Sequence, residues 1–186
     1  MYRKQQSERS GGSHADLILA LVRFLQPRTY VELGVAQGET FEPVHREQIS
    51  KGRFAVGCDL SIQARPIIGV DYGVKSLDFV RPMLDRSVDL AFIDADHRHD
   101  SVIADVMELS PKMAPNGIVL LHDTYPPNET YLADGYCSDS WRAAQTLHNQ
   151  HGSYYESVTL AAEWGLTIIR FHGGRQLGWK PDSFLD

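Results

Sequence analysis

Residues 29–40, with the sequence TYVELGVAQGET, constrain the fold more than any other stretch of this chain. The first part, TYVEL, is mostly β-branched, aromatic and apolar, which is typical of a short buried strand. The next part, GVAQG, consists of small residues that let the backbone turn sharply and approach a ligand closely. A helical pattern then runs through about residue 50. This order of strand, loop and helix predicts a ligand site at the carboxyl edge of a parallel sheet.

The spacing of the glycines limits which ligand this loop can hold. A nicotinamide-dinucleotide loop follows the pattern G-x-G-x-x-G, but the sixth position counted from Gly34 is Glu39. The chain instead shows an acidic residue, Glu32, two positions before Gly34, and a second glycine at Gly38. An ordinary tight turn without a ligand explains the loop equally well, so the rest of the chain has to decide.

The remaining sequence alternates apolar runs with helical patterns. Helices are expected at residues 16–25, 39–50, 76–84, 100–113 and 140–150, and strands at 29–33, 53–58, 67–70, 88–93, 118–121, 154–160 and 165–171. Residues 124–139 contain two adjacent prolines and are expected to form an irregular loop. The alternation predicts an α/β fold, a doubly wound, Rossmann-like, mainly parallel seven-stranded sheet with helices on both faces. The last two strands lack a helix between them, which predicts an antiparallel strand at one edge.

Length and charge restrict the class of protein. A chain of 186 residues is long enough for one domain, expected at 14–186, after a flexible polar arm at 1–13. The net charge of −6 and the lack of a basic cluster argue against a nucleic-acid partner. We see neither a signal peptide nor an apolar run of about 18 residues, so we expect a cytoplasmic protein without a membrane partner. Of the two cysteines, Cys58 is expected to be a buried thiol.

Ionisable residues recur at the ends of the predicted strands. Glu32 lies in the first strand, Asp59 and Asp94 follow the second and fourth, and His122 and Asp123 follow the fifth. All of them would lie along one rim of the sheet, where such folds bind their ligands. The alternative for each aspartate is a helix N-cap, a position that Asp favours in any protein.

The residues around Asp59 suit a nucleoside. Asp59 lies 21 residues beyond Gly38, where a carboxylate can accept both ribose hydroxyls. Leu60 could provide an apolar wall for a base, and Ser76 could donate to the base edge. A serine at position 76 is also a good N-cap, so its role stays open.

The stretch FIDADHRHD, residues 92–100, is the densest group of ionisable residues. Asp94 and Asp123 end adjacent strands and could hold a divalent cation through oxygen, with His122 or Thr124 as the third ligand. His97 follows Asp94 by three residues and can remove a proton from a substrate hydroxyl near neutral pH. His99 is more simply explained by a solvated turn.

With these residues in place, residues 29–170 resemble the class I S-adenosylmethionine (SAM) methyltransferases. The likeness is greatest to metal-dependent small-molecule O-methyltransferases of the catechol, caffeoyl-coenzyme A and macrolide-sugar types. VELGVAQGET is similar to their first motif, with Ala36 where glycine is common, and FIDADH with GIVLLHDT is similar to the two segments that hold the metal. The resemblance implies a cofactor site made of Glu32, Gly34, Ala36, Gly38, Thr40, Asp59, Leu60, Ser76, Asp94 and Ala95.

The resemblance also implies a mechanism. Asp94, His122 and Asp123 would bind Mg²⁺ or a similar cation, although the catechol type has asparagine where Thr124 stands and the macrolide-sugar type has an acid where His122 stands. His97 occupies the place of the catalytic base. The expected reaction is methyl transfer from SAM to a hydroxyl of a small molecule. From its aromatic content, we expect the 124–139 loop to wall the acceptor pocket with Tyr125, Tyr131 and Tyr136, followed by Trp141, although the three tyrosines could equally be surface residues.

Three alternatives remain at this point. The first is a metal-independent methyltransferase acting on nitrogen or oxygen, with Asp94 serving SAM and His122 and Asp123 forming a hydrogen-bonded base pair. The second is a non-catalytic SAM-binding domain. The third, a nucleotide-sugar or NAD enzyme of the same fold, conflicts with the loop spacing. A homodimer is plausible through the arm and the late strands.

Overall fold

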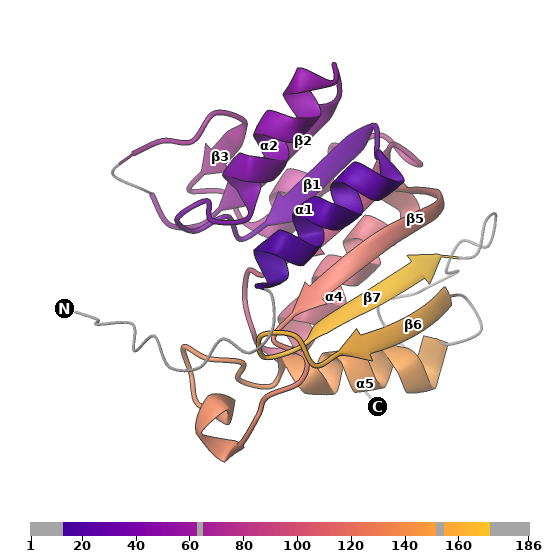
Figure 1. Cartoon of the computed structure of the whole chain (residues 1–186). Helices are drawn as coiled ribbons and strands as arrows, with labels where there is room; N and C mark the ends of the chain where they lie inside the picture. Colours follow the sequence, from indigo (N-terminus) through magenta and orange to yellow (C-terminus); the bar gives the residue numbers. More distant parts are fainter. Residues whose placement is uncertain (1–12, 63–64, 152–154, 172–186) are drawn as a thin grey trace.

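The computed structural model describes residues 13–62, 65–151 and 155–171. Seven strands form one sheet in the order β3-β2-β1-β4-β5-β7-β6 (Figure 1). The strands are β1 Thr29–Leu33, β2 Phe54–Asp59, β3 Val70–Tyr72, β4 Val88–Ile93, β5 Met113–His122, β6 Tyr155–Leu160 and β7 Leu166–Phe171. β1 to β5 pair in parallel, whereas β7 is antiparallel to both β5 and β6. The predicted seven-stranded, mainly parallel sheet is therefore confirmed, with its antiparallel strand next to one edge.

Helices cover both faces of the sheet, as predicted. The α-helices are α1 His14–Leu25, α2 Phe41–Ser50, α3 Ser76–Val80, α4 His99–Leu109 and α5 Ser140–His151, and short 3₁₀ helices lie at Ser110–Lys112 and Glu129–Leu132. Side chains alternate between the two faces along each strand. In β1, Tyr30 packs with the side chains of α1 and α2, while Val31 and Leu33 pack with those of α3, α4 and α5.

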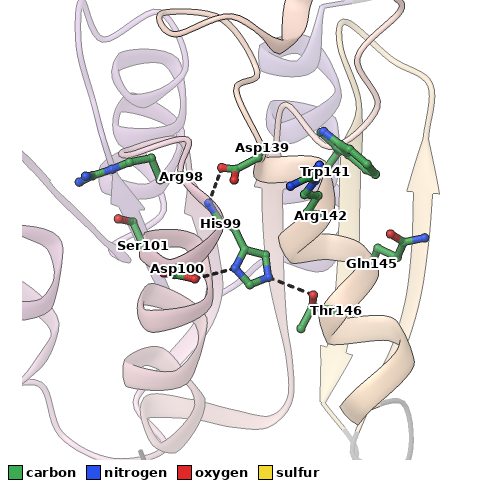
Figure 2. A pocket seen from close by; sticks show the side chains of 9 residues that line it. All are labelled: Arg98, His99, Asp100, Ser101, Asp139, Trp141, Arg142, Gln145 and Thr146. Carbon is green, nitrogen blue, oxygen red and sulfur yellow. Dashed lines mark hydrogen bonds and ion pairs between the residues drawn. The ribbon is translucent and has the colours of Figure 1, made fainter. Parts of the chain in front are cut away.

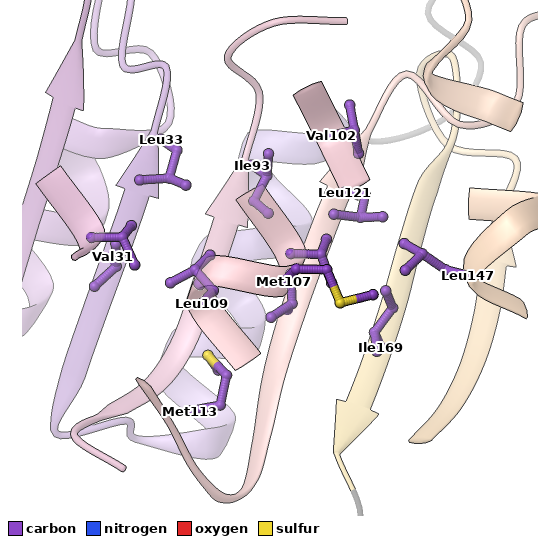
Figure 3. Close-up of a cluster of buried hydrophobic side chains, with 14 of the residues drawn as sticks. Val31, Leu33, Ile93, Val102, Met107, Leu109, Met113, Leu121, Leu147 and Ile169 are labelled. Atoms are coloured by element: carbon purple, nitrogen blue, oxygen red, sulfur yellow. The ribbon is translucent and has the colours of Figure 1, made fainter. Parts of the chain in front are cut away.

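The larger core lies between the sheet and α4 and α5. Figure 3 shows Leu33, Ile93 and Leu121 side by side on β1, β4 and β5, facing the apolar side of α4. α4 contributes Val102, Val106 and Leu109, which follow the helical spacing seen in the sequence. Burying both faces of the central strands fixes their register, and it thereby fixes the rim at which they end.

The chain changes direction across the sheet between β1 and β4. β2 and β3 lie on one side of β1, and β4 and β5 lie on the other. The connections after β1 and β4 therefore lead to opposite sides of the sheet, and in sheets of this kind ligands bind in the crevice at the carboxyl ends of the strands that flank such a switch point. Backbone hydrogen bonds close the base of this crevice, because Asp94 N donates to Leu33 O at 2.8 Å and Gly34 N donates to Cys58 O at 2.9 Å.

Four element boundaries differ from the predicted ones by more than two residues, and prolines and turns explain three of them. The strand expected at 67–70 begins at its last residue, because Gly69 (φ 87°) makes a turn before the pairing with β2. The helix expected to reach residue 84 ends at Val80, shortly before Pro82, and the helix expected to reach 113 ends at Leu109, before Pro111. The fifth strand begins at Met113 rather than 118, since a register shift lets it pair with β4 through the expected turn at 115–117.

The other predictions either agree with the structure or concern residues outside the described ranges. Residues 124–139 are irregular except for the 3₁₀ turn at Glu129–Leu132. Cys58 is buried, as predicted. The arm expected at 1–13 lies outside the described residues apart from Ser13, which caps α1. Within the described ranges, none of the helices is both long and apolar enough to cross a membrane.

Candidate active site

The small-residue loop after β1 lies directly against the segment that follows β4. Gly34 has φ 86°, a conformation that other residues adopt only with strain. A Cβ at this position would lie 2.2 Å from the carbonyl oxygen of Asp94 and 2.6 Å from Cα of Ala95. The two loops thus pack backbone to backbone at the switch point, and only glycine allows this approach.

The rest of this loop is held by the end of β2. One carboxylate oxygen of Asp59 accepts a hydrogen bond from Ala36 N at 2.6 Å, and the other accepts from Ser61 N at 2.7 Å. Ala36 has φ 47°, which explains why glycine is common at such a position. Asp59 therefore fixes the conformation of the loop after β1. Asp59 and this loop were expected to bind the same ligand.

Glu32 is placed under the loop rather than in the open crevice. Its side chain is 1% exposed and accepts a hydrogen bond from the Tyr30 hydroxyl at 2.5 Å. Burial raises the pKa of Glu32 well above its usual range, although the hydrogen bond from Tyr30 opposes this. Contact of Glu32 with a cofactor stays a prediction, and the same holds for Thr40, whose hydroxyl lies 3.3 Å from His14 Nε2.

Four predicted residues converge where β4 and β5 end. His122 Nδ1 lies 3.1 Å from Asp94 Oδ1 and 3.4 Å from Asp123 Oδ1. His97 Nε2 lies 3.4 Å from Asp94 Oδ1, and His97 Nδ1 lies 3.1 Å from Asp123 Oδ2. The His97 Nδ1 atom also contacts the backbone carbonyl of Tyr136, which can only accept. The two carboxylates and the two imidazoles therefore form one connected group.

The two candidates for a third ligand differ in their surroundings. His122 faces both carboxylates, as given above, and its other ring nitrogen, Nε2, lies 3.1 Å from the backbone carbonyl of Glu163. Thr124 is buried, and its hydroxyl accepts a hydrogen bond from Thr167 on β7 at 2.8 Å. The structure thus brings His122, rather than the Thr124 hydroxyl, into contact with Asp94.

Electrostatics in this group follow from burial and from the paired charges. Burial would raise the pKa of Asp94, but hydrogen bonds from His122 and His97 outweigh it and hold the pKa below its usual value. Burial would lower the pKa of His97, but its contacts with Asp94, the Tyr136 carbonyl and Asp123 raise it to about 9. With only protein groups around it, His97 is therefore protonated at neutral pH. Because the charges of Asp94 and Asp123 raise its pKa, offsetting these charges lowers the pKa and allows His97 to act as a base.

Two of the expected cofactor residues lie apart from this group. The Leu60 side chain is 65% exposed beyond the end of β2. Ser76 is the first residue of α3, and its hydroxyl donates to Asp105 Oδ1 on α4 at 2.5 Å. A role for either residue at a nucleoside stays a prediction.

A cavity of about 690 Å³ lies between the beginnings of α4 and α5 (Figure 2). His99 is held there as a structural residue, because its ring contacts Asp100 Oδ1 at 2.7 Å and Thr146 Oγ1 at 3.0 Å, and its backbone N donates to Asp139 Oδ1 at 2.6 Å. The remaining lining residues are Arg98, Ser101, Trp141, Arg142 and Gln145. Trp141, which was expected to wall an acceptor, lines this cavity and stacks with the Arg142 guanidinium at 5.3 Å.

The three tyrosines of the 124–139 loop differ in their contacts. Tyr131 packs against Tyr136 and Trp164, with ring centroids 5.4 and 5.6 Å apart. Tyr125 is 58% exposed and Tyr136 is 43% exposed. Ser140, at the end of the loop, donates to the His97 carbonyl at 3.0 Å. The loop therefore holds His97 in place as well as presenting aromatic side chains.

Two residues beside the site were missed by sequence reasoning. His14, at the start of α1, packs on His122 with ring centroids 4.0 Å apart. Its Nδ1 lies 2.9 Å from Glu163 Oε2, across 149 positions of the sequence. Neither residue is part of a motif, and only the folded chain brings them together.

Comparison with known proteins identifies the family. A family model described as a methyltransferase domain matches residues 31–124, half of the chain. No curated protein sequence matches the chain.

Solved structures share the fold at low sequence identity. The chain resembles the methyltransferase PaMTH1 of Podospora anserina bound to S-adenosylhomocysteine (SAH), with a TM-score of 0.68 and 16% identity over 84% of this chain and 77% of that one. The chain also resembles an O-methyltransferase of Bacillus cereus in complex with SAH, with a TM-score of 0.64 and 16% identity over 88% of this chain and 84% of that one. For a candidate caffeoyl-CoA O-methyltransferase of Staphylococcus aureus the TM-score is 0.64 and the identity is 16%, over 84% of this chain and 82% of that one. The chain belongs to the methyltransferase-domain family, and methyltransferases solved with SAH bound share its fold.

Proposed function

We propose that this chain transfers the methyl group of SAM to a hydroxyl oxygen of a small molecule, with His97 as the catalytic base. The observation that carries the proposal is the position of His97, within 3.4 Å of Asp94 and 3.1 Å of Asp123 at the crevice beside Gly34. We assign this activity to a single domain at residues 14–186. The O-methyltransferases of similar fold from B. cereus and S. aureus support an oxygen acceptor.

The cofactor site in this proposal follows the rim of the sheet. Gly34, Ala36 and Gly38 would hold the methionine part of SAM together with Glu32, and Thr40 would bind its carboxylate. Asp59 accepts the ribose hydroxyls, Leu60 and Ser76 flank the base, and Asp94 and Ala95 face the sulfonium. The close approach of the Gly34 and Asp94 backbones supports this arrangement, because it leaves no side chain between the two loops.

The residues present fit a divalent cation held by Asp94, His122 and Asp123. The Nε2 atom of His122 faces a carbonyl that can only accept, so Nε2 carries a proton. A bound cation would replace the proton that His122 Nδ1 donates to the carboxylates and would leave the Nδ1 lone pair as a ligand. A nitrogen lone pair beside two carboxylate oxygens is a metal-binding donor set. A cation there would lower the pKa of a substrate hydroxyl.

His97 then acts by proton transfer and orientation. Its Nδ1–H donates to the Tyr136 carbonyl, which leaves Nε2 to take the proton of the acceptor hydroxyl. The acceptor oxygen forms a bond to the methyl carbon, and the carbon–sulfur bond of SAM breaks to give SAH. Since the sulfonium is already a good leaving group, the protein contributes mainly by positioning the two reactants.

A metal-independent methyltransferase, acting on nitrogen or oxygen, is the second candidate. The contact of His97 Nδ1 with Asp123 Oδ2 at 3.1 Å favours it, because a histidine and an aspartate at this distance can act as a base pair without a cation. Dialysis against a chelator separates the two candidates, since only the metal-assisted enzyme loses turnover.

The experiment that tests the proposal measures where the methyl group goes. The full chain is incubated with methyl-labelled SAM, Mg²⁺ or Mn²⁺, and a panel of phenolic and sugar hydroxyl acceptors with matched amines. We expect label in an ether product and loss of that product in His97→Gln. Label only in the amines would refute the oxygen acceptor.

The remaining expectations belong to the same proposal. The acceptor is a small molecule enclosed by the 124–139 loop, and the protein works in the cytoplasm without nucleic-acid or membrane partners. β6 is an edge strand, which supports a homodimer formed by pairing with a second copy.

A further inference from the structure

We propose that His14 is an additional ligand of the cation at Asp94 and His122, so that the site contains two imidazoles and prefers a first-row transition metal to Mg²⁺. This rests on the cation site of the proposed function and extends it to a residue from the beginning of α1.

The donor atoms lie at the spacing that one ion requires. His14, Asp94 and His122 each offer a ligand atom, and these atoms all lie within 4.8 Å of one another. Ligands bind a transition metal at about 2.0–2.2 Å, so two donors on opposite sides of one ion lie about 4.2 Å apart. The three side chains can therefore bind one ion with small adjustments of their rotamers.

Glu163 orients both imidazoles. Its backbone carbonyl accepts from His122 Nε2 at 3.1 Å, and its carboxylate lies 2.9 Å from His14 Nδ1. A metal-binding histidine usually donates its other ring N–H to a carboxylate or a carbonyl, which fixes the ring and the tautomer. One residue provides both kinds of acceptor here, and a proton on each of these nitrogens leaves the opposite nitrogen as a ligand atom.

The remaining nitrogen of His14 lies next to a hydroxyl and carries the lone pair that a ligand atom needs. His14 Nε2 lies 3.3 Å from the Thr40 hydroxyl, a group that can donate to a lone pair. The position of the ring is fixed by two further contacts, because the backbone N of His14 donates to Glu163 Oε2 at 3.0 Å and the ring packs 4.0 Å from that of His122. Figure 1 shows the start of α1, the end of β5 and the turn between β6 and β7 together at this rim.

The donor set determines which metal is favoured. Mg²⁺ prefers oxygen ligands and keeps several waters, whereas imidazole suits transition metals such as Fe²⁺, Ni²⁺ and Zn²⁺, and affinity at such sites rises from Mn²⁺ through Fe²⁺ to Co²⁺. Two histidines and one aspartate therefore favour these ions over Mg²⁺.

The test is calorimetric titration of the full chain with CoCl₂, MnCl₂ and MgCl₂. We compare the wild type with His14→Gln, with Glu163→Ala, and with His148→Gln as the matched control, since His148 lies away from the site on α5 and bonds Ser157. The wild type is expected to bind Co²⁺ and Mn²⁺ more tightly than Mg²⁺. Both His14→Gln and Glu163→Ala are expected to lose Co²⁺ affinity by about tenfold or more, and His148→Gln is expected to keep it.

Equal Co²⁺ affinity in His14→Gln and His148→Gln would overturn the inference while leaving the cation site of the proposed function intact. Loss of Co²⁺ binding in Asp94→Asn tests that underlying site separately. If His14→Gln does not fold, pulsed electron paramagnetic resonance of Mn²⁺ bound to the wild type decides, because it detects coupled imidazole nitrogens. Two coupled histidines support the inference, and one contradicts it.

Discussion

Replacing Gly34 by alanine perturbs the closest backbone contact of the crevice. The alanine must adopt φ 86°, which costs about 1–2 kcal/mol for a residue with a Cβ. The new methyl group would lie 2.2 Å from the Asp94 carbonyl oxygen. Neither atom can rotate away, because the oxygen is part of the backbone and the methyl group is bonded directly to it. Overpacking of this kind costs about 1–3 kcal/mol more. We therefore expect Gly34→Ala to lower the free energy of unfolding by about 2–5 kcal/mol.

Gly52 provides the matched control. It has φ 67°, and a Cβ there would meet nothing within 4 Å, so Gly52→Ala is expected to cost only the conformational term of about 1–2 kcal/mol. Urea denaturation of both variants measures the difference, and calorimetry with SAH measures binding. Gly34→Ala should also weaken SAH binding, because the two loops must separate, whereas Gly52→Ala should not. Equal destabilisation of the two variants would refute the close-approach reasoning.

Other side chains give further predictions. His97→Gln should abolish methyl transfer but keep SAH affinity within about twofold of the wild type, measured by label transfer and calorimetry. Chelator should remove turnover, and Mn²⁺ should restore it. Burial raises the pKa of Asp105 from 3.8 to about 6, against the hydrogen bond from Ser76. The folded state therefore binds this proton more tightly, and the free energy of unfolding should fall by roughly 3 kcal/mol as the pH rises from about 4 to 6. Asp105→Asn should remove this fall in urea titrations between pH 4 and 8, and an unchanged pH profile would contradict it.

The number and positions of the strands and the row of acids at the rim followed from local patterns. Apolar alternation and small-residue turns predicted the seven strands, and a parallel sheet necessarily gathers its strand ends at one rim. For this reason Asp94, His97, His122 and Asp123 could be grouped from the sequence, and the structure places them in contact.

Contacts between distant segments were not predictable in the same way. The pairing of His14 with Glu163 depends on how α1 lies over the sheet and on a turn in which Glu163 has φ 37°. The hydrogen bond from the Tyr30 hydroxyl to the carboxyl group of Glu32, on the same face of β1, was likewise not predicted. Both arrangements depend on side-chain packing that no short motif encodes.

Calorimetric titration of the full chain with SAH, in the wild type and in Gly34→Ala, measures whether the cofactor binds beside Gly34. If the crevice between the loops after β1 and β4 holds the cofactor, the wild type binds one SAH per chain and Gly34→Ala binds it at least about tenfold more weakly, a loss of about 1.4 kcal/mol. Equal affinity in a folded Gly34→Ala variant would show that the cofactor lies elsewhere and would contradict the account.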